Sequence, residues 1–212
     1  MNDFHDQVIT RNETVDGLGP WYWLKDDNGA WDGPKMDWET SHKNVYFQKV
    51  QKYDVVVQAG GCLGMYPRLL ARNFTKVYTF EPDPLNFHVL TLNCQDPNIV
   101  KFNCALGHEH FLVSLHRRST SNVGMHGISL RKDEKIPVMM IDDLALDECD
   151  MICLDVESYE SAVLLGALNT IDKFRPVITC ENGNDDILNI LSPYGYDTHT
   201  TSVSDTIYYK NR

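Results

Sequence analysis

The chain has 212 residues, of which 42% are hydrophobic, and a formal net charge of -11 at pH 7. This length predicts one domain with a sizeable core, and the acidic balance argues against duplex nucleic acid as a partner, because phosphate backbones are bound through Lys and Arg. No apolar run approaches the roughly 20 residues of a membrane span, and the first residues lack the basic-then-apolar pattern of a secretory signal. We therefore expect a cytosolic protein that does not bind membranes. Its six cysteines form no C-x-x-C pair, so we expect free thiols.

Residues 1–50, the N-terminal arm, hold all four tryptophans among Gly, Asp and Asn, with no sustained period of 3.6 or 2. Disordered segments are poor in aromatic residues, so we expect the arm to be packed although irregular. Two accounts stay open: its rings cover one face of the core, or they form a lid or a wall of the substrate site. The main domain is predicted over residues 51–212.

From residue 53 onward, apolar strands alternate with helical segments, which is the pattern of parallel βαβ units. Strands are predicted at 53–58, 76–81, 99–103, 111–115, 136–141, 150–155 and 176–181, and helices at 66–73, 84–94, 160–168 and 185–191. A polar loop is predicted at 117–127, and a closing antiparallel pair at 196–200 and 206–210. The sequence therefore predicts an α/β fold with a doubly wound sheet.

Ligands of such sheets bind beyond the carboxyl ends of the strands, and the predicted strand ends here are polar. The first strand ends at Gln58 and runs into A-G-G-C-L-G, residues 59–64. Glycines allow a tight turn and let a ligand lie against bare backbone beside a helix N-terminus. The spacing G-G-x-x-G fits neither a dinucleotide fold nor a P-loop. It indicates a cofactor with an anionic or carboxylate group, with a purely structural turn as the alternative.

Glu81 ends the second predicted strand. An acid at this position can accept both hydrogen bonds of a ribose diol. Together with the glycine turn it indicates an adenosine-containing cofactor, and the alternative is an exposed carboxylate at a strand end.

A third acidic group, L-D-V-E-S-Y-E, contains Asp155, Glu157 and Glu160 at a strand-to-helix turn. Acids at a helix start can serve as caps, and this explains Glu157 or Glu160 readily. Asp155 ends the strand itself, so we expect it to face the same cleft as the glycine turn. There it could hold an ammonium group or position a hydroxyl group, and Glu181 ends the next strand.

Several blocks together resemble the FkbM-type S-adenosylmethionine-dependent methyltransferases: VVVQAGGCLGMYPRLLA (55–71), VYTFEPDPLNFHVLTLN (77–93), ALG (105–107), PVMMIDDL (137–144), MICLDVESYESAVLLGAL (151–168) and RPVITCEN (175–182). The resemblance covers about residues 50–182. It implies a class I methyltransferase (Rossmann-like) fold, with a mostly parallel seven-stranded sheet and an antiparallel strand near one edge.

The resemblance also implies S-adenosylmethionine as the cofactor and S-adenosylhomocysteine as the product. The residues that it places around the cofactor are Gln58, Ala59, Gly60, Gly61 and Gly64 at the methionine portion, Glu81 and Pro82 at the ribose, Asn103, Cys104 and Ala105 at the adenine, and Asp155 near the methyl group. Two positions depart from the family pattern. Gln58 stands where an acid is usual, and Ser158 stands where a glycine is usual.

Family members of assigned role mostly methylate hydroxyl oxygens, so we expect O-methylation of a small-molecule or glycan acceptor, with the arm stacking on it. An alcohol needs a base or a metal to become nucleophilic. The candidate catalytic residues are Asp155, Glu157, Glu181 and His116, with His126 as a further histidine. Asp155 and Glu181 offer oxygen ligands that would suit Mg²⁺, although we do not expect a metal to be required.

Two other functions stay open at this point. One is a cofactor-binding module without turnover, which the changes at Gln58 and Ser158 would favour. The other is N-methylation of a nucleobase or protein, which the acidic charge and the absence of an N/D-P-P-Y/F motif disfavour. The basic run His116-Arg117-Arg118 could hold one phosphate or acidic sugar, or lie in solvent.

Overall fold

The computed structural model describes residues 4–15, 17–27, 46–119, 121–129, 135–181, 183–200 and 205–210. The strands are β1 Val8–Arg11, β2 Trp21–Leu24, β3 Val55–Ala59, β4 Lys76–Phe80, β5 Ile99–Phe102, β6 Ala105–Leu106, β7 Leu112–Arg117, β8 His126–Ser129, β9 Ile136–Met139, β10 Met151–Leu154, β11 Val177–Glu181, β12 Asp197–Thr200 and β13 Asp205–Tyr209. The α-helices are α2 Met65–Leu70, α3 Pro84–Asn93, α4 Glu160–Leu165, α5 Leu168–Phe174 and α6 Asp185–Leu191. Short 3-10 turns are η1 Phe4–Gln7, η2 Val123–Met125, η3 Ile141–Leu144 and η4 Ser192–Tyr194.

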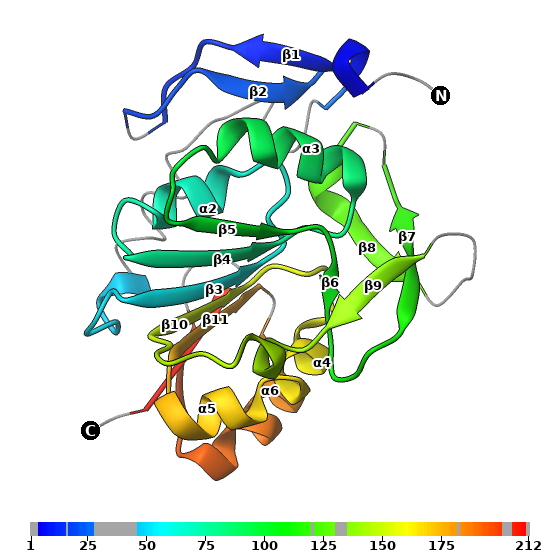
Figure 1. Cartoon of the computed structure of the whole chain (residues 1–212). Helices are drawn as coiled ribbons and strands as arrows, with labels where there is room; N and C mark the ends of the chain where they lie inside the picture. The colour runs from blue at the N-terminus through cyan, green and yellow to red at the C-terminus, as the bar shows by residue number, and fades with distance from the viewer. Residues whose placement is uncertain are drawn as a thin grey trace.

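The central sheet has seven strands in the order β12-β13-β11-β10-β3-β4-β5. The strands from β11 to β5 pair in parallel, whereas β13 runs antiparallel to both of its neighbours. Helices α2 and α3 lie on one face, and α4, α5 and α6 lie on the other (Figure 1). The predicted α/β fold is therefore confirmed, and the carboxyl ends of the parallel strands meet along one edge.

Strand β10 shows why the sheet is covered on both faces. Ile152 and Leu154 belong to the apolar cluster beneath α4, α5 and α6, while Met151 and Cys153 belong to the cluster on the α2 and α3 side. A parallel strand buried on both faces reads as a continuous apolar run, and this is the M-I-C-L pattern of the sequence. None of the described helices has the length and apolar content needed to span a bilayer. All six cysteines are free thiols, as expected.

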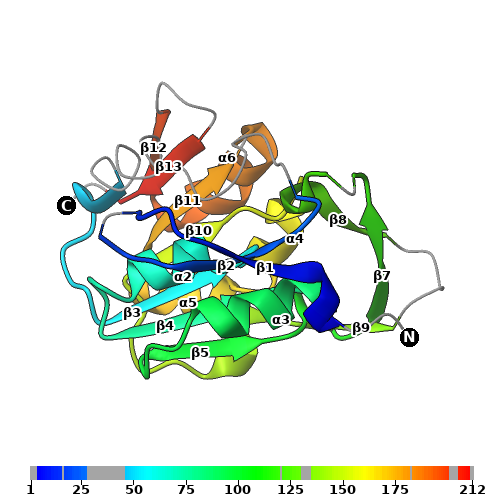
Figure 2. The same ribbon diagram turned by 90° about the horizontal axis from the view of Figure 1, so that it is seen from above.

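The described part of the N-terminal arm contains an antiparallel pair, β1 and β2, called here the hairpin. Figure 2 shows the hairpin lying across α2 and α3. The sequence does not predict these four-residue strands, because β2 has no alternation: Trp21, Trp23 and Leu24 are all buried. They pack with Leu63 and Val89 in one apolar cluster. Trp31 and Trp38 lie outside the described residues.

Two side chains fix the hairpin to the main domain. Asn93 at the end of α3 accepts a hydrogen bond from the Tyr22 backbone N at 2.8 Å and donates one to the Tyr22 carbonyl at 2.8 Å. The Arg68 guanidinium lies 4.5 Å from the centre of the Trp21 ring. These contacts hold the hairpin against α2 and α3, whereas both accounts of the arm and the domain boundary after residue 50 stay predictions.

Residues 105–139, called here the insert, form a second sheet in the order β6-β9-β7-β8. The predicted polar loop at 117–127 is wrong at its end, because Arg117 pairs with His126 and the chain continues as β8. The backbone of β8 obtains its hydrogen bonds by pairing with β7, and its polar sequence alone does not indicate this pairing.

The predicted helix at 160–168 is two helices, α4 and α5, which break at Gly166. A Cβ at this glycine would lie 1.9 Å from the Gly107 carbonyl oxygen. The start of the insert therefore passes directly against the break, and only a residue without a side chain fits there.

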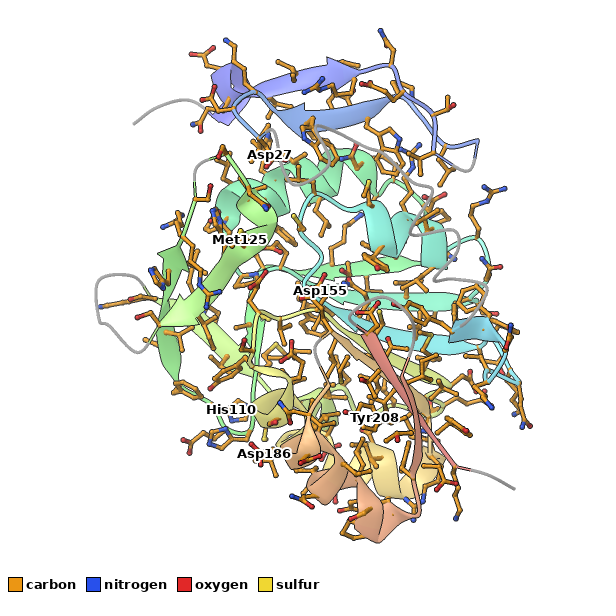
Figure 3. All side chains as sticks on the ribbon, turned by 180° about the vertical axis from the view of Figure 1, so that it is seen from behind. Asp27, His110, Met125, Asp155, Asp186 and Tyr208 are labelled. Atoms are coloured by element: carbon orange, nitrogen blue, oxygen red, sulfur yellow. The ribbon has the colours of Figure 1, made fainter. Side chains whose placement is uncertain are left out.

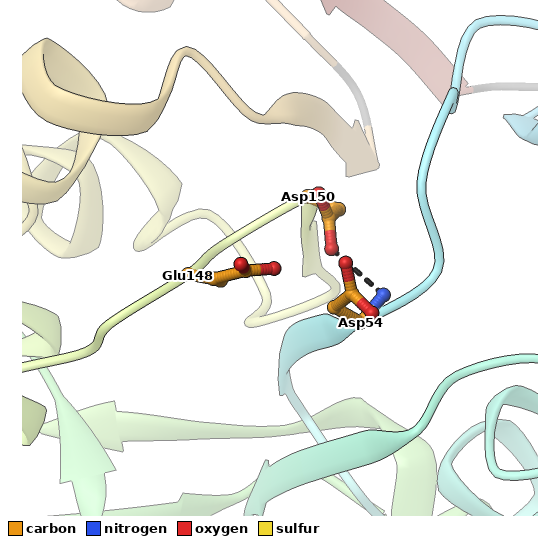
Figure 4. A group of neighbouring side chains, drawn as sticks. All are labelled: Asp54, Glu148 and Asp150. Carbon is orange, nitrogen blue, oxygen red and sulfur yellow. Dashed lines mark hydrogen bonds between the residues drawn. The ribbon is translucent and has the colours of Figure 1, made fainter.

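At the opposite edge of the sheet, the amino ends of β3 and β10 carry a small acidic group (Figure 4). The Asp150 carboxylate accepts hydrogen bonds from the backbone N of Asp54 at 2.8 Å and of Val55 at 3.0 Å. Glu148 lies in solvent beside them, and the hydrogen bond with Asp54 raises its pKa. The Asp150 carboxylate therefore binds the backbone N–H groups at the beginning of β3.

Candidate functional site

A cavity of about 200 Å³ opens at the carboxyl ends of the parallel strands, far larger than the roughly 10–15 Å³ that one water needs. Its walls come from the glycine turn, the loop after β4, the start of the insert, the η2–β8 segment and the end of the hairpin. Figure 3 shows Asp155 near the middle of the molecule and Asp27 beside the hairpin.

The structure brings most of the predicted cofactor residues together. The predicted residues that line the cavity are Ala59, Gly60, Gly61, Glu81, Pro82, Cys104, Ala105 and Asp155. The predicted residues that do not line it are Gln58, Gly64, Asn103, Glu157, Glu181 and His116.

Neighbours within the chain account for the glycines of the turn. A Cβ at Gly60 would lie 1.7 Å from the Asp155 carbonyl oxygen, and one at Gly61 would lie 2.4 Å from the Leu90 side chain. Gly60 and Gly64 also have left-handed backbone, with φ of +82° and +95°. Packing within the protein therefore also requires glycine at these positions, while the expectation that a ligand excludes side chains here stays a prediction.

Backbone donors of the turn are also in use. The N–H groups of Gly60 and Gly61 both donate to the Phe80 carbonyl, at 3.1 and 2.9 Å. Gly60 and Gly61 nevertheless line the cavity, so the turn forms a close-packed floor for it.

Gln58 lies behind the turn and is fully buried. Its Oε1 accepts a hydrogen bond from Thr79 Oγ1 at 2.6 Å, and its Nε2 donates to the carbonyls of Ala59 and Gly60 at 3.1 and 2.9 Å. A glutamine can satisfy both roles, whereas a carboxylate could not donate to these carbonyls. Gln58 therefore holds the shape of the turn.

Asn103, predicted at the adenine, is exposed and plays a similar supporting role. Its Nδ2 donates to the Glu81 carbonyl at 2.8 Å and to the Pro82 carbonyl at 3.3 Å. It thereby orients the loop that carries the two predicted ribose-side residues.

Glu81 is 5% exposed and lies on the cavity wall. Its Oε2 accepts a hydrogen bond from the Cys62 backbone N at 2.7 Å, and its Oε1 accepts one from the Asp83 backbone N at 2.8 Å. Burial raises its pKa to about 8, although both N–H donors favour the ionised form. Each carboxylate oxygen has a second lone pair, so Glu81 can still accept hydrogen bonds from a ligand.

The three predicted catalytic acids lie together. One carboxylate oxygen each of Asp155, Glu157 and Glu181 falls within 4.8 Å of the other two. Burial and then the Glu181 carboxylate raise the pKa of Asp155 well above its usual range, and the same causes raise the pKa of Glu157. Like charges this close favour a shared proton. Their oxygens would also suit Mg²⁺, and the expectation that no metal is required stays a prediction.

The backbone of this acidic turn is strained. Glu157 and Ser158 have φ of +52° and +75°, values that favour glycine. Arg118 from the insert donates to the Glu157 carboxylate at 3.2 Å. The turn is therefore held between the main domain and the insert.

The two candidate histidines differ in exposure and in their position relative to the cavity. His116 lies on β7, is exposed and does not line the cavity. His126 lines the cavity, with Nδ1 3.1 Å from the Asp83 carboxylate and Nε2 2.9 Å from the Ser119 carbonyl. Both partners are acceptors, so both contacts are hydrogen bonds only when both ring nitrogens carry protons. An imidazolium cannot take up a further proton, which makes His126 unsuited as a base.

The pKa values of this pair agree with the geometry. Burial lowers the pKa of His126, but the hydrogen bonds to Asp83 and Ser119 outweigh it and the net shift is upward. Burial raises the pKa of Asp83, but His126, the Leu85 N–H and Arg117 outweigh it and the net shift is downward.

Sequence reasoning missed several residues of the cavity wall. The missed polar and aromatic ones include Trp23, Asp27, Tyr66, Phe80, Asn86, Asn122 and Tyr159. Asn86 belongs to the E-P-D-P-L-N-F block and could have been found there. Trp23 and Asp27 carry no signal, since the position of the hairpin depends on contacts made by distant residues.

A family model described as "Methyltransferase FkbM domain" matches residues 59–198 of the chain. No curated protein sequence matches the chain significantly. Among solved structures, the chain is similar to the FkbM methyltransferase from Methylobacillus flagellatus KT, with a TM-score of 0.54 and 20% identity over 80% of this chain and 51% of that one. The chain therefore spans about half the length of that relative.

Two further structures share the fold. Precorrin 8w decarboxylase from Methanobacterium thermoautotrophicum gives a TM-score of 0.50 and 14% identity over 87% of this chain and 96% of that one. Trm5b from Pyrococcus abyssi gives a TM-score of 0.51 and 12% identity over 94% of this chain and 54% of that one. At these identities the likeness establishes the fold alone.

Proposed function

Because the chain belongs to the FkbM methyltransferase family, we propose that it binds S-adenosylmethionine in the cavity and methylates a hydroxyl oxygen of a sugar or another small molecule. One observation carries the proposal. The glycine turn, Glu81 and Asp155, which come from three separate strand ends, line a single cavity.

The residues of the cavity suit each portion of the cofactor. Glu81 offers acceptor oxygens to the ribose, while Pro82, Cys104 and Ala105 provide a largely apolar wall for the adenine. Gly60 and Gly61 would lie under the methionine portion. When bound, the cofactor supplies an electrophilic methyl group on a sulfonium.

The protein's share of the reaction is alignment, exclusion of water and removal of one proton. In-line transfer needs the acceptor oxygen held at the methyl group. We assign the proton to Asp155, the one member of the acidic trio that lines the cavity. Its raised pKa makes the ionised carboxylate a stronger proton acceptor. Glu157 and Glu181 would share the proton afterwards.

Ser158 favours the alternative of cofactor binding without turnover, because its left-handed backbone strains the turn beside Asp155. The change at Gln58 no longer favours this alternative, since Gln58 supports the turn from behind. The N-methyltransferase alternative keeps the same cofactor site and differs in the acceptor.

Calorimetric titration with S-adenosylhomocysteine and incubation of labelled S-adenosylmethionine with a panel of glycans and hydroxylated small molecules test the proposal. We expect Asp155→Asn to slow transfer about 100-fold or more, the usual contribution of a general base, while affinity for S-adenosylhomocysteine changes little. Asp186→Asn, an exposed acid on α6 (Figure 3), is the matched control and should change neither quantity.

The outcomes separate the alternatives. Binding without transfer to any acceptor would support the binding module. Equal losses of transfer and binding in Asp155→Asn would assign Asp155 a structural role. Absence of binding to both the donor and its demethylated product would refute the proposal.

A further inference from the structure

We propose that Asp27, in the N-terminal arm, is a second acid of the cofactor site and accepts a hydrogen bond from the ribose diol together with Glu81. This inference rests on the proposed function, and it makes the arm a part of the cofactor site.

Asp27 is a buried carboxylate on the wall of the same cavity as Glu81. It is 4% exposed, and its Oδ1 accepts a hydrogen bond from the Val123 backbone N at 3.0 Å. Cys62 lines the same cavity and its backbone N donates to Glu81, and after burial the charges of Glu81 and then Asp27 raise the pKa of its thiol. Both carboxylates therefore face one cavity and act on the same residue of its wall.

Two further polar atoms on this wall lack a partner. The Trp23 indole Nε1 and the Asn86 side-chain Oδ1 are buried, and neither has a hydrogen-bond partner within the described residues. Buried polar atoms in native proteins are almost always paired. A vicinal diol offers two O–H donors and two acceptor oxygens, which would complement a carboxylate, an amide oxygen and an indole N–H.

The hairpin contacts hold this part of the wall in place. Asn93 binds the backbone of Tyr22 and also donates to the Leu63 carbonyl at 2.7 Å, so the hairpin and the glycine turn share one anchor. Val123 is held from both sides, since Asp27 accepts from its N–H and the Asn86 Nδ2 donates to its carbonyl at 3.3 Å. Asp27 is therefore positioned before any ligand arrives.

The rival account gives Asp27 only a structural role, as the acceptor for Val123. One substitution keeps the hydrogen bond with the Val123 N–H and weakens the hydrogen bond with the ribose diol. Asn at position 27 retains a side-chain oxygen for the Val123 N–H but loses the negative charge that would strengthen a hydrogen bond from a hydroxyl group.

The test is calorimetric titration of the full chain with S-adenosylhomocysteine and with its 2′,3′-dideoxy analogue. We expect Asp27→Asn to weaken binding of S-adenosylhomocysteine about tenfold, the value of one charge-assisted hydrogen bond, and to leave binding of the dideoxy analogue within about twofold. Asp26→Asn removes the same charge from the exposed neighbouring residue and should change neither affinity.

Trp23→Phe is the second variant. It replaces Asp27→Asn as the test if thermal unfolding without ligand shows that Asp27→Asn is not folded. It removes the unpartnered N–H and keeps an aromatic ring. We expect a severalfold loss for S-adenosylhomocysteine and none for the dideoxy analogue.

An equal loss for both ligands, or no loss for either, would overturn the assignment of Asp27 and leave the proposed function standing. Failure of the unmodified protein to bind S-adenosylhomocysteine would instead refute the proposed function itself.

Discussion

At the scale of single residues, Glu81 has two tasks that two measurements on one variant can separate. Its carboxylate accepts hydrogen bonds from the backbone N of Cys62 and of Asp83, which joins the glycine turn to the loop after β4. Removing the acceptor leaves two buried donors unpaired, at about 1–3 kcal/mol for each.

We therefore expect Glu81→Ala to lower the free energy of unfolding of the cofactor-free protein by roughly 2–6 kcal/mol. Affinity for S-adenosylhomocysteine should fall as well, by a few kcal/mol at most, on the order of two charged hydrogen bonds. Denaturant unfolding without ligand measures the first quantity, and calorimetry measures the second. Unchanged affinity would remove Glu81 from the cofactor site, and unchanged stability would show that its backbone hydrogen bonds contribute nothing net.

Ser158 and Ser192 offer a matched pair of exposed serines. Ser158 has a left-handed φ of +75°, whereas Ser192 ends α6 with a right-handed φ of -58°. Left-handed backbone costs a residue with a Cβ roughly 1–2 kcal/mol, and glycine avoids this cost. We expect Ser158→Gly to raise the free energy of unfolding by up to about 1 kcal/mol and Ser192→Gly to lower it by a similar amount. Denaturant midpoints measure both, and the same sign of change in the two variants would contradict the strain at Ser158.

At the scale of elements, what can be predicted from sequence depends on whether an element carries its own signal. Helix α3 is predicted at 84–94 and is found at Pro84–Asn93, because Asp83 caps it through the Leu85 N–H and Pro84 stands at its start. The strand-end acids Glu81 and Asp155 converge on the cavity because parallel strands end along one edge.

The unpredicted elements owe their places to partners. Strand β8 forms because β7 supplies its hydrogen bonds, and the hairpin is placed by Asn93 and Arg68, which lie far away in sequence. Asp27 and Trp23 reach the cavity only through that placement. No local pattern at these residues could have indicated it.

The insert is tied to the loop after β4 by a contact that depends on pH. Because the folded pKa of His126 is raised, its pairing with Asp83 stabilises the protein fully below the ordinary value of 6.5 and is lost as pH rises through the raised value. Because the folded pKa of Asp83 is lowered, its share is lost only as pH falls below its ordinary value of 3.8. The contact is therefore strongest in mildly acidic solution.

We expect amide hydrogen exchange, corrected for intrinsic rates, to show that β7 and β8 lose protection relative to β10 when the pH rises from about 6 to about 8.5. His126→Gln should give low protection of β7 and β8 at both pH values. His116→Gln, on the exposed side of β7, should behave as the unmodified protein. Equal protection of β7 and β8 at both pH values in the unmodified protein would show that the His126 contact does not hold the insert.

At the scale of the whole molecule, buried acids in and beside the cavity set the pH dependence of stability. Burial is the main cause of raised pKa values at Glu81, which reaches about 8, and at Asp155, Glu157 and Glu160. Groups with raised folded pKa values bind more protons in the folded state than in the unfolded one, so the free energy of unfolding falls as pH rises through this range. The excess negative charge of the chain acts in the same direction.

We expect the cofactor-free protein to be most stable near pH 5 and to lose melting temperature steadily up to about pH 8, because a tenfold difference in proton affinity between the folded and unfolded states is equivalent to about 1.4 kcal/mol. Asp155→Asn should flatten this profile, because it removes one buried acid and relieves the repulsion that Glu157 and Glu181 feel. Asp186→Asn, which removes an exposed acid, should leave the slope unchanged. Thermal unfolding across this pH range measures all three proteins. A melting temperature that rises between pH 5 and pH 8 would mean that these buried acids are ionised and compensated in the folded protein, since only then would the unfolded chain bind more protons.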